Sequence, residues 1–228
     1  MSLYNGLDES LCKLFVERHI KYAKILKSLF TQTQYFTTNY IIKSSNELIN
    51  EWLDSYKSER QLYIPLIKKK DGSEKWLYEI NKHILPPHTV INYKDISTLS
   101  DECDILFIDD WCLSGNNCTS VIDNITYDLK NKLKRNVLIK FYVVSVIMTE
   151  TAIYQIKKIH KNTFFYYKNK IDIFKDSSLE FDEFIKTFQP DTEWTAHPVH
   201  LEYKIANQFG SFEKIYSKCR SCEINKPY

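Results

Sequence analysis

Glycine and proline are scarce in this chain of 228 residues, which contains only 4 glycines and 6 prolines. So few chain-breaking residues argue against low-complexity linkers. No apolar run is long enough to span a bilayer. The first residues also lack the basic segment and apolar core of a secretion signal. These absences favour a folded, cytoplasmic protein without a membrane span.

An excess of charge of one sign is also lacking. The 31 basic and 29 acidic residues leave a formal net charge of +2, whereas proteins that bind nucleic acid usually show a concentrated basic face. The 6 cysteines are scattered, which favours reduced thiols over a disulfide framework. No Gly-x-x-x-x-Gly-Lys-Ser/Thr loop occurs, so the phosphate cradle of a P-loop NTPase is missing. The composition therefore argues against nucleic acid as a partner and against that class of enzyme.

The chain is long enough for one α/β domain with a helical cap. Helical spacing of apolar residues over 9–30 and 45–56, with Ser45 as the second N-cap, predicts a mainly helical cap or hood over residues 1–60. Residues 61–228 are predicted to form an α/β domain with a C-terminal extension. Because strand and helix patterns alternate there, we expect a mainly parallel sheet flanked by helices.

The predicted strands of this domain cover residues 62–67, 89–93, 105–108, 137–147, 164–167 and 171–174. The predicted helices cover residues 73–80, 117–133, 149–159 and 179–188, and Ser73 and Thr149 stand where each would begin.

Residues 104–119, Asp-Ile-Leu-Phe-Ile-Asp-Asp-Trp-Cys-Leu-Ser-Gly-Asn-Asn-Cys-Thr, are the most informative stretch. The apolar residues 105–108 predict a buried parallel strand. Asp109 and Asp110 follow where that strand would leave its sheet, and a helical pattern begins near Asn117. Carboxylates accept hydrogen bonds from ribose hydroxyls or hold Mg²⁺, and a helix N-terminus attracts phosphate. The stretch is therefore predicted to hold a phosphorylated sugar.

This stretch resembles the motif with which type I phosphoribosyltransferases bind phosphoribosyl pyrophosphate (PRPP). That motif has an apolar strand, two acidic residues, three further residues, Thr-Gly, one residue, and Thr or Ser. Asp109 and Asp110 match the acidic pair, and Ser114-Gly115 matches Thr-Gly at the expected spacing. Asn117 replaces the second hydroxyl residue, although its amide can still donate a hydrogen bond. The chain is similar to divergent phosphoribosyltransferase-like domains that are predicted to act in biological-conflict systems.

The resemblance implies roles for these residues. Asp109 and Asp110 would be catalytic and would position the ribose hydroxyls. The loop that wraps the 5-phosphate would consist of Leu113, Ser114, Gly115, Asn116 and Asn117. Gly115 would let the backbone approach that phosphate closely. A nucleophile would attack ribose C1 and displace pyrophosphate, and Mg²⁺ would be the cofactor that offsets the leaving-group charge.

A lysine-rich turn follows the first predicted strand of the sheet and includes Lys70, Asp71, Gly72 and Ser73. In phosphoribosyltransferases this location holds the loop that contacts the pyrophosphate of PRPP, whose charge lysines can neutralise. The alternative is a solvated hairpin tip with an Asp-Gly turn.

Two further groups of residues have a functional and a structural interpretation. His197, His200, Cys219 and Cys222 form two pairs that could supply four zinc ligands, or they are surface histidines and reduced cysteines. Tyr166 and Tyr167 are aromatic residues of the core or of a sheet edge, or they stack on a nucleobase.

Taken together, these patterns predict a phosphoribosyltransferase-like protein that binds PRPP or a nucleotide-like small molecule. It would transfer the phosphoribosyl group to an unidentified nucleophile and release pyrophosphate. The alternative is a non-catalytic module that senses a nucleotide or PRPP, or that keeps the old site as a scaffold, because a fold does not fix an activity. A homodimer is compatible with either function.

Overall fold

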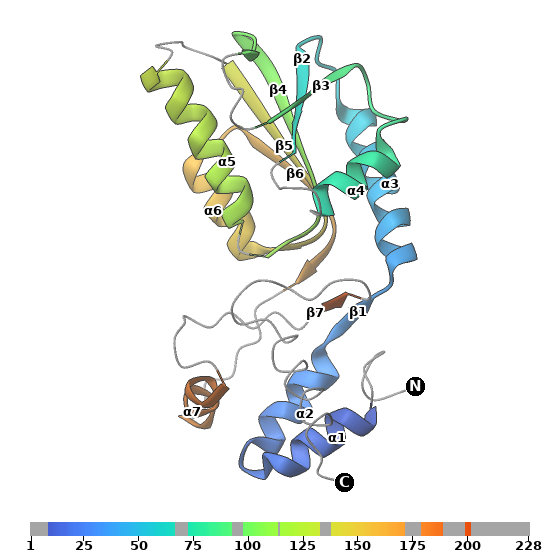
Figure 1. The fold of residues 1–228 in the computed structure, drawn as a ribbon, viewed down its shortest axis with the longest axis vertical. Coiled ribbons are helices and arrows are strands. Elements are labelled where there is room, and N and C mark those ends of the chain that lie inside the picture. The colour runs from blue at the N-terminus through green and yellow to red at the C-terminus, as the bar shows by residue number, and fades with distance from the viewer. Residues whose placement is uncertain are drawn as a thin grey trace. The chain divides into compact units, whose positions relative to one another are not determined.

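The computed structural model describes residues 9–66, 73–92, 98–113, 115–132, 138–171, 179–188 and 199–201 (Figure 1). The described residues fall into two compact units. One contains residues 9–38, 179–188 and 199–201, and the other contains the described part of residues 39–171. Helix α3 (Thr38–Ser55) lies almost wholly in the second unit. The predicted division into a cap and a domain at residue 60 stays a prediction.

The second unit is built on a five-stranded parallel sheet with the strand order β3-β2-β4-β5-β6. Helices α3 and α4 cover one face of this sheet, and α5 and α6 cover the other (Figure 1). The bounds are β2 (Gln61–Pro65), α4 (Ser73–Asn81), β3 (His88–Ile91), β4 (Glu102–Cys112), α5 (Asn116–Tyr127), β5 (Leu138–Thr149), α6 (Glu150–Ile159) and β6 (Thr163–Ile171). This arrangement confirms the predicted α/β fold with a parallel sheet flanked by helices.

The two central strands, β4 and β5, are buried on both faces, as expected for a parallel sheet between two helical layers. On the side of α5 and α6, Phe107 stacks on Phe141 with 6.1 Å between the ring centroids. On the side of α3, Trp52 meets the edge of Tyr142 at 5.9 Å. Apolar side chains are therefore packed on both faces of the sheet.

Asp104 is a charged residue immediately before the apolar run of β4. Its side chain is fully buried, and its charge acts on the phenols of Tyr56 and Tyr142. Burial and the charge of Asp104 raise the pKa of Tyr56 to about 12, and the same two causes raise the pKa of Tyr142. Both phenols therefore stay neutral at physiological pH.

In the second unit, one helix start and one pair of strand candidates differ most from the prediction. Helix α3 begins at Thr38 rather than at Ser45. Ser45 does not cap the helix but lies within it, and its hydroxyl donates to the Ile42 carbonyl at 2.9 Å. The two strand candidates at 164–167 and 171–174 correspond to one strand, β6, which ends at Ile171. Residues 172–174 lie outside the described residues.

The first unit is mainly helical and contains α1 (Glu9–Arg18), a 3₁₀ turn (Ile20–Tyr22), α2 (Ala23–Gln32) and α7 (Leu179–Phe188). The single helix predicted over residues 9–30 is interrupted at His19, whose φ of −118° and ψ of 48° are not helical. Phe181 and Phe184 of α7 share one hydrophobic core with α1 and α2. A short parallel pairing joins β1 (Gln34–Phe36) to β7 (Val199–Leu201). None of the helices described in either unit has the length and apolar character that crossing a membrane requires.

Lowering the pH below about 6.5 is expected to destabilise the second unit through His160. Its ring packs against Phe141 at 4.7 Å, and burial lowers the pKa of His160 below its ordinary value of 6.5. The unfolded chain therefore binds this proton more readily than the folded chain, so stability falls as the pH drops from 6.5 to the lowered pKa. The free energy of unfolding in urea, measured at pH 7.5 and at pH 5.5, shows the effect. A His160→Gln variant should lose less stability than the parent between these two values, and an equal loss would contradict this role.

Candidate active site

The strand order of the sheet reverses between β2 and β4, which makes a topological switch point. After β2 the chain runs through α4 to β3 on one side, whereas β4 lies on the other side of β2. Helices α4 and α5 consequently leave on opposite faces of the sheet (Figure 1). Moreover, β2 pairs with β4 only from Gln61↔Cys103 to Tyr63↔Ile105, so the later residues of β4 extend beyond that pairing. In open α/β sheets, ligands bind in the crevice beyond the carboxyl ends of the strands at such a switch point.

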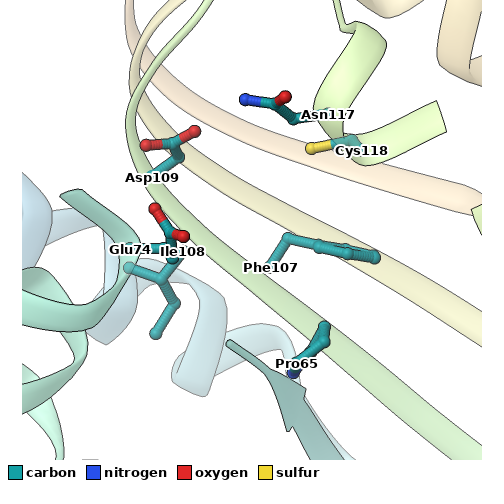
Figure 2. Close-up of a pocket in the computed structure, with 7 residues that line it drawn as sticks. All are labelled: Pro65, Glu74, Phe107, Ile108, Asp109, Asn117 and Cys118. Atoms are coloured by element: carbon teal, nitrogen blue, oxygen red, sulfur yellow. The ribbon is translucent and has the colours of Figure 1, made fainter. Parts of the chain in front are cut away.

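A pocket occupies this position. The pocket is a small hollow, with about 300 Å³ of space between its lining atoms when the open solvent at its mouth is included. Figure 2 shows the side chains that line it. They come from β2, α4, β4 and α5 and are Pro65, Glu74, Phe107, Ile108, Asp109, Asn117 and Cys118. The pocket therefore lies between the first turns of α4 and α5, and two of the predicted site residues, Asp109 and Asn117, face it together.

The two carboxylates of the predicted acidic pair differ in environment. Both lie near the carboxyl end of β4 but still within the strand, because β4 continues to pair with β5 up to Cys112. Asp109 is partly exposed and lines the pocket, and its Oδ1 accepts hydrogen bonds from the Ser73 hydroxyl at 2.8 Å and the Asp110 N–H at 2.9 Å. Asp110 is fully buried and accepts the Trp111 N–H at 2.8 Å. Only Asp109 is therefore placed to meet a ligand in the pocket.

Glu74 is a pocket residue that the sequence analysis did not identify. It lies in the first turn of α4, is 7% exposed, and brings a second carboxylate to the pocket of Asp109. In the sequence, only its position next to Ser73 indicated that Glu74 could belong to the site. A hydrogen bond with Cys112, burial, and the charges of Asp109 and Glu74 raise the pKa of the Cys118 thiol well above its usual range. Cys118 therefore stays protonated and is not a nucleophile.

Gly115 marks the start of α5, and its φ of 74° is the left-handed conformation that favours glycine. A Cβ at this position would lie 3.1 Å from the carbonyl oxygen and 3.2 Å from the Cα of Ala152 in α6. The close approach made by this glycine is thus to α6, and Gly115 does not line the pocket. Beyond it, Asn116 and Asn117 are exposed in the first helical turn, where backbone N–H groups lack intrahelical acceptors.

Thr149 connects the loop after β4 to helix α6. Its hydroxyl donates to the Leu113 carbonyl, and the same oxygen accepts the Ala152 N–H at 3.0 Å as the N-cap of α6. The helix start predicted at Thr149 is therefore confirmed, while its bond to Leu113 could not be foreseen. Leu113 itself is 2% exposed and does not line the pocket.

The model of the PRTase-CE family matches residues 13–221, which is most of the chain. The chain belongs to the PRTase-CE family. The predicted relationship to phosphoribosyltransferase-like proteins is thereby confirmed. No curated protein sequence matches the chain.

Solved structures that resemble this PRTase-CE chain include phosphoribosyltransferases. Orotate phosphoribosyltransferase from Aeropyrum pernix is 9% identical, with a TM-score of 0.37 over 58% of this chain and 70% of its own. The AQ2163 protein from Aquifex aeolicus is 14% identical, with a TM-score of 0.43 over 75% and 88%. A hypothetical protein from Neisseria gonorrhoeae with bound ppGpp is 12% identical, with a TM-score of 0.39 over 67% and 94%. At these scores the likenesses carry no conclusion about activity.

The remaining predicted residues of the PRTase-CE chain are only partly described. Lys70, Asp71, Gly72 and Ser114 lie outside the described residues, and so do His197, Cys219 and Cys222. His200 falls in β7, where the structure describes the backbone alone. Among the side chains that are described, no three of His, Cys, Asp or Glu form a cluster able to hold a metal ion. The pyrophosphate loop and the zinc site therefore stay predictions.

The pocket of this PRTase-CE chain nevertheless suits Mg²⁺. Magnesium is usually held by one or two carboxylates, with water and substrate phosphates completing its shell, rather than by a cage of protein ligands. Asp109 and Glu74 supply two carboxylates in one pocket. This donor set matches that mode of binding.

Proposed function

We propose that this PRTase-CE protein binds PRPP, or a related ribose-5-phosphate ligand, in the pocket between α4 and α5, and that it transfers the phosphoribosyl group. The observation that carries the proposal is the position of Asp109. This partly exposed carboxylate lines a pocket at the switch point of the sheet. The exposed Asn117, at the start of the helix that follows β4, lines the same pocket. A ligand with ribose hydroxyls and a phosphate matches these groups.

Each part of the pocket has a role in this proposal. The Asp109 carboxylate accepts hydrogen bonds from the ribose hydroxyls, and the Ser73 hydroxyl, 2.8 Å away, fixes its orientation. The N–H groups in the first turn of α5 and the Asn117 amide bind the 5-phosphate. Phe107 and Pro65 form an apolar wall of the pocket. Asp109 and Glu74 would hold Mg²⁺, which when bound supplies positive charge beside the pyrophosphate.

The reaction exchanges one bond at ribose C1 for another. A lone pair of the acceptor forms the new bond to C1 while the bond from C1 to the pyrophosphate oxygen breaks, and its electrons leave with pyrophosphate. The acceptor then loses its proton to a base. Positive charge grows on the sugar during this exchange, and the carboxylate of Asp109 beside the ribose offsets part of it.

A binding module without catalysis is the second candidate. The three residues between the acidic pair and Ser114 are Trp111, Cys112 and Leu113, and none of them carries a carboxylate or imidazole that could accept the acceptor's proton. Cys112 and Leu113 are also buried. These features would allow a ligand to be held at Asp109 and sensed without being consumed.

PRPP is expected to bind only when Mg²⁺ is present, because the charges of its pyrophosphate would otherwise face two carboxylates in one pocket. Isothermal titration calorimetry with PRPP, first in Mg²⁺ and then in EDTA, measures this dependence. A pyrophosphate-release assay with a panel of nucleobases then separates transfer from sensing. Ribose-5-phosphate serves as the matched ligand without pyrophosphate and should bind in both buffers. No PRPP binding in either buffer would contradict the proposal.

A further inference from the structure

Strand β6 forms a long edge of the sheet. It pairs with β5 from Phe141↔Thr163 to Thr149↔Ile171, and within the described part of the chain no strand pairs with its other side. The opposite edge, β3, has only the 4 residues His88–Ile91. An edge strand of 9 residues presents a row of backbone donors and acceptors that another strand can pair with.

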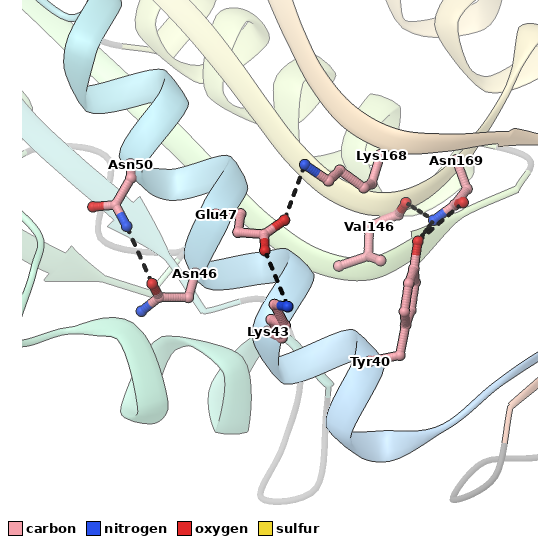
Figure 3. A network of polar contacts seen from close by, with 8 residues as sticks. All are labelled: Tyr40, Lys43, Asn46, Glu47, Asn50, Val146, Lys168 and Asn169. Carbon is pink, nitrogen blue, oxygen red and sulfur yellow. Dashed lines mark hydrogen bonds and ion pairs between the residues drawn. The ribbon is translucent and has the colours of Figure 1, made fainter.

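Large apolar side chains are exposed along this edge. Phe164 and Tyr167 of β6 are 44% and 38% exposed. Tyr40 of α3 is 38% exposed and is joined to Asn169 of β6 by a hydrogen bond of 2.9 Å (Figure 3). On α6, Tyr154 is 66% exposed and lies one helical turn before Lys157, whose amine is 5.5 Å from the ring centroid of Phe165. Because α3 and α6 lie on opposite faces of the sheet (Figure 1), these exposed side chains flank the edge on both faces.

The two lysines of β6 are not placed to prevent another strand from pairing with this edge. Exposed lysines on an edge strand normally discourage pairing with another chain. Here Lys168 forms an ion pair of 3.0 Å with Glu47 of α3 (Figure 3), and Lys170 forms one with Glu150 of α6. Both side chains are thus directed to helices of their own chain, which leaves the outer side of β6 accessible.

From these observations we propose that β6 is the interface of a homodimer, in which the β6 strands of two copies pair antiparallel about a twofold axis. A twofold axis between two identical edges gives an isologous, antiparallel contact. The two five-stranded sheets then form one continuous sheet. The partner that pairs with β6 is a second copy of this chain rather than a different protein, because two antiparallel β6 strands can pair without placing like charges opposite each other.

The self-complementarity depends on the register. With Tyr167 at the middle of β6 and on the twofold axis, all nine residues of the strand are paired. Lys168 then lies opposite Tyr166 of the partner subunit, and Lys170 lies opposite Phe164 of the partner subunit. Each lysine therefore meets an aromatic ring, and no two lysines face one another. A shift of the axis to Lys168 or Asn169 would place lysine opposite lysine, which is destabilising.

Sedimentation equilibrium over a range of protein concentrations tests the proposal. We expect the parent chain to dimerise and Tyr167→Asp to raise the dissociation constant at least tenfold, because two carboxylates would then meet on the axis. Tyr127→Asp is the matched control, since Tyr127 is an exposed tyrosine of the same unit on α5, and it should dimerise as the parent does. A parent chain that stays monomeric at all concentrations, or a folded Tyr167→Asp variant that dimerises normally, would overturn the proposal.

Cysteine cross-linking tests the register and does not depend on a destabilising charge. Opposite residues of an antiparallel pair have Cα atoms about 4.5–5.5 Å apart, within the range of about 4.4–6.8 Å that a disulfide bridges. With air oxygen as oxidant, two Tyr167→Cys thiols should become one intermolecular disulfide, and the oxygen is reduced. Lys161→Cys is the control, because its two copies would be roughly 40 Å apart. The cross-linked fraction is compared with that of the parent, and equal cross-linking of Tyr167→Cys, Lys161→Cys and parent would exclude the proposed register.

Discussion

Asparagine in place of Asp109 is expected to weaken the binding of PRPP by about tenfold to a hundredfold without unfolding the chain. The substitution keeps the volume of the side chain and removes its charge from the pocket. A hydrogen bond to a charged group contributes about 1.5–3 kcal/mol, and about 1.4 kcal/mol corresponds to a tenfold change in affinity. Titration calorimetry in Mg²⁺ measures the effect. Unaltered affinity in a folded Asp109→Asn variant would refute the assignment of this carboxylate to the ribose.

The neighbouring position provides the matched control. Asp110 is fully buried and does not line the pocket, and it accepts the N–H of Trp111. In Asp110→Asn an amide donor replaces a carboxylate oxygen in a buried site, which costs about 1–3 kcal/mol when the donor finds no partner. We therefore expect Asp110→Asn to lower the free energy of unfolding more than Asp109→Asn does, and to change PRPP affinity less. The reverse pattern would show that Asp110, rather than Asp109, meets the ligand.

Valine at Gly115 is expected to destabilise the second unit strongly. A left-handed backbone conformation costs a non-glycine residue about 1–3 kcal/mol, and crowding of a packed region costs about 1–3 kcal/mol more. The crowding arises because a Cβ would lie 3.2 Å from the Cα and 3.1 Å from the carbonyl oxygen of Ala152, which belong to the backbone of α6 and cannot rotate away. Domains of this kind have a total stability of about 5–15 kcal/mol, so the loss is a large fraction of it.

Urea unfolding followed by circular dichroism measures this loss, and a second variant separates its two causes. Asparagine tolerates a positive φ better than valine does but still carries the Cβ. If contact with α6 dominates, Gly115→Asn should lose nearly as much stability as Gly115→Val. If the backbone conformation dominates, it should lose much less. A Gly115→Val variant with the parent's midpoint would contradict both explanations.

Local patterns in the sequence predicted the parts of the fold that local physics determines. The apolar residues 105–108 became the centre of β4, because a strand buried on both faces needs an uninterrupted apolar run. Helix α6 begins after Thr149, whose hydroxyl caps it, and α7 has the predicted bounds. In contrast, Ser45 suggested a helix start although it lies within α3, because a serine hydroxyl can also bond to a carbonyl of the preceding turn.

The candidate site was predictable only where it lies within one segment of the chain. Asp109 and Asn117 belong to one strand-loop-helix motif, so their spacing placed both at the pocket. Glu74 reaches the same pocket from α4, and only the tertiary arrangement of β2 and β4 brings it there. The sequence explained Gly115 by a close phosphate, which stays a prediction, and the structure adds that a Cβ at Gly115 would meet the backbone of α6. A glycine indicates that two groups approach each other, but it does not identify the second group.

The wholly parallel sheet also has a consequence for how this chain folds. Paired residues of neighbouring strands are separated by roughly 20 to 40 positions in the sequence. None of these pairings can therefore start as a hairpin. Each requires the closure of a loop before any backbone hydrogen bond between the strands compensates for the lost entropy. Folding rates fall as contacts become less local. Newly synthesised chains should therefore expose the apolar strands β4 and β5 for longer than a hairpin-rich protein would, and they would benefit from a chaperone during that interval.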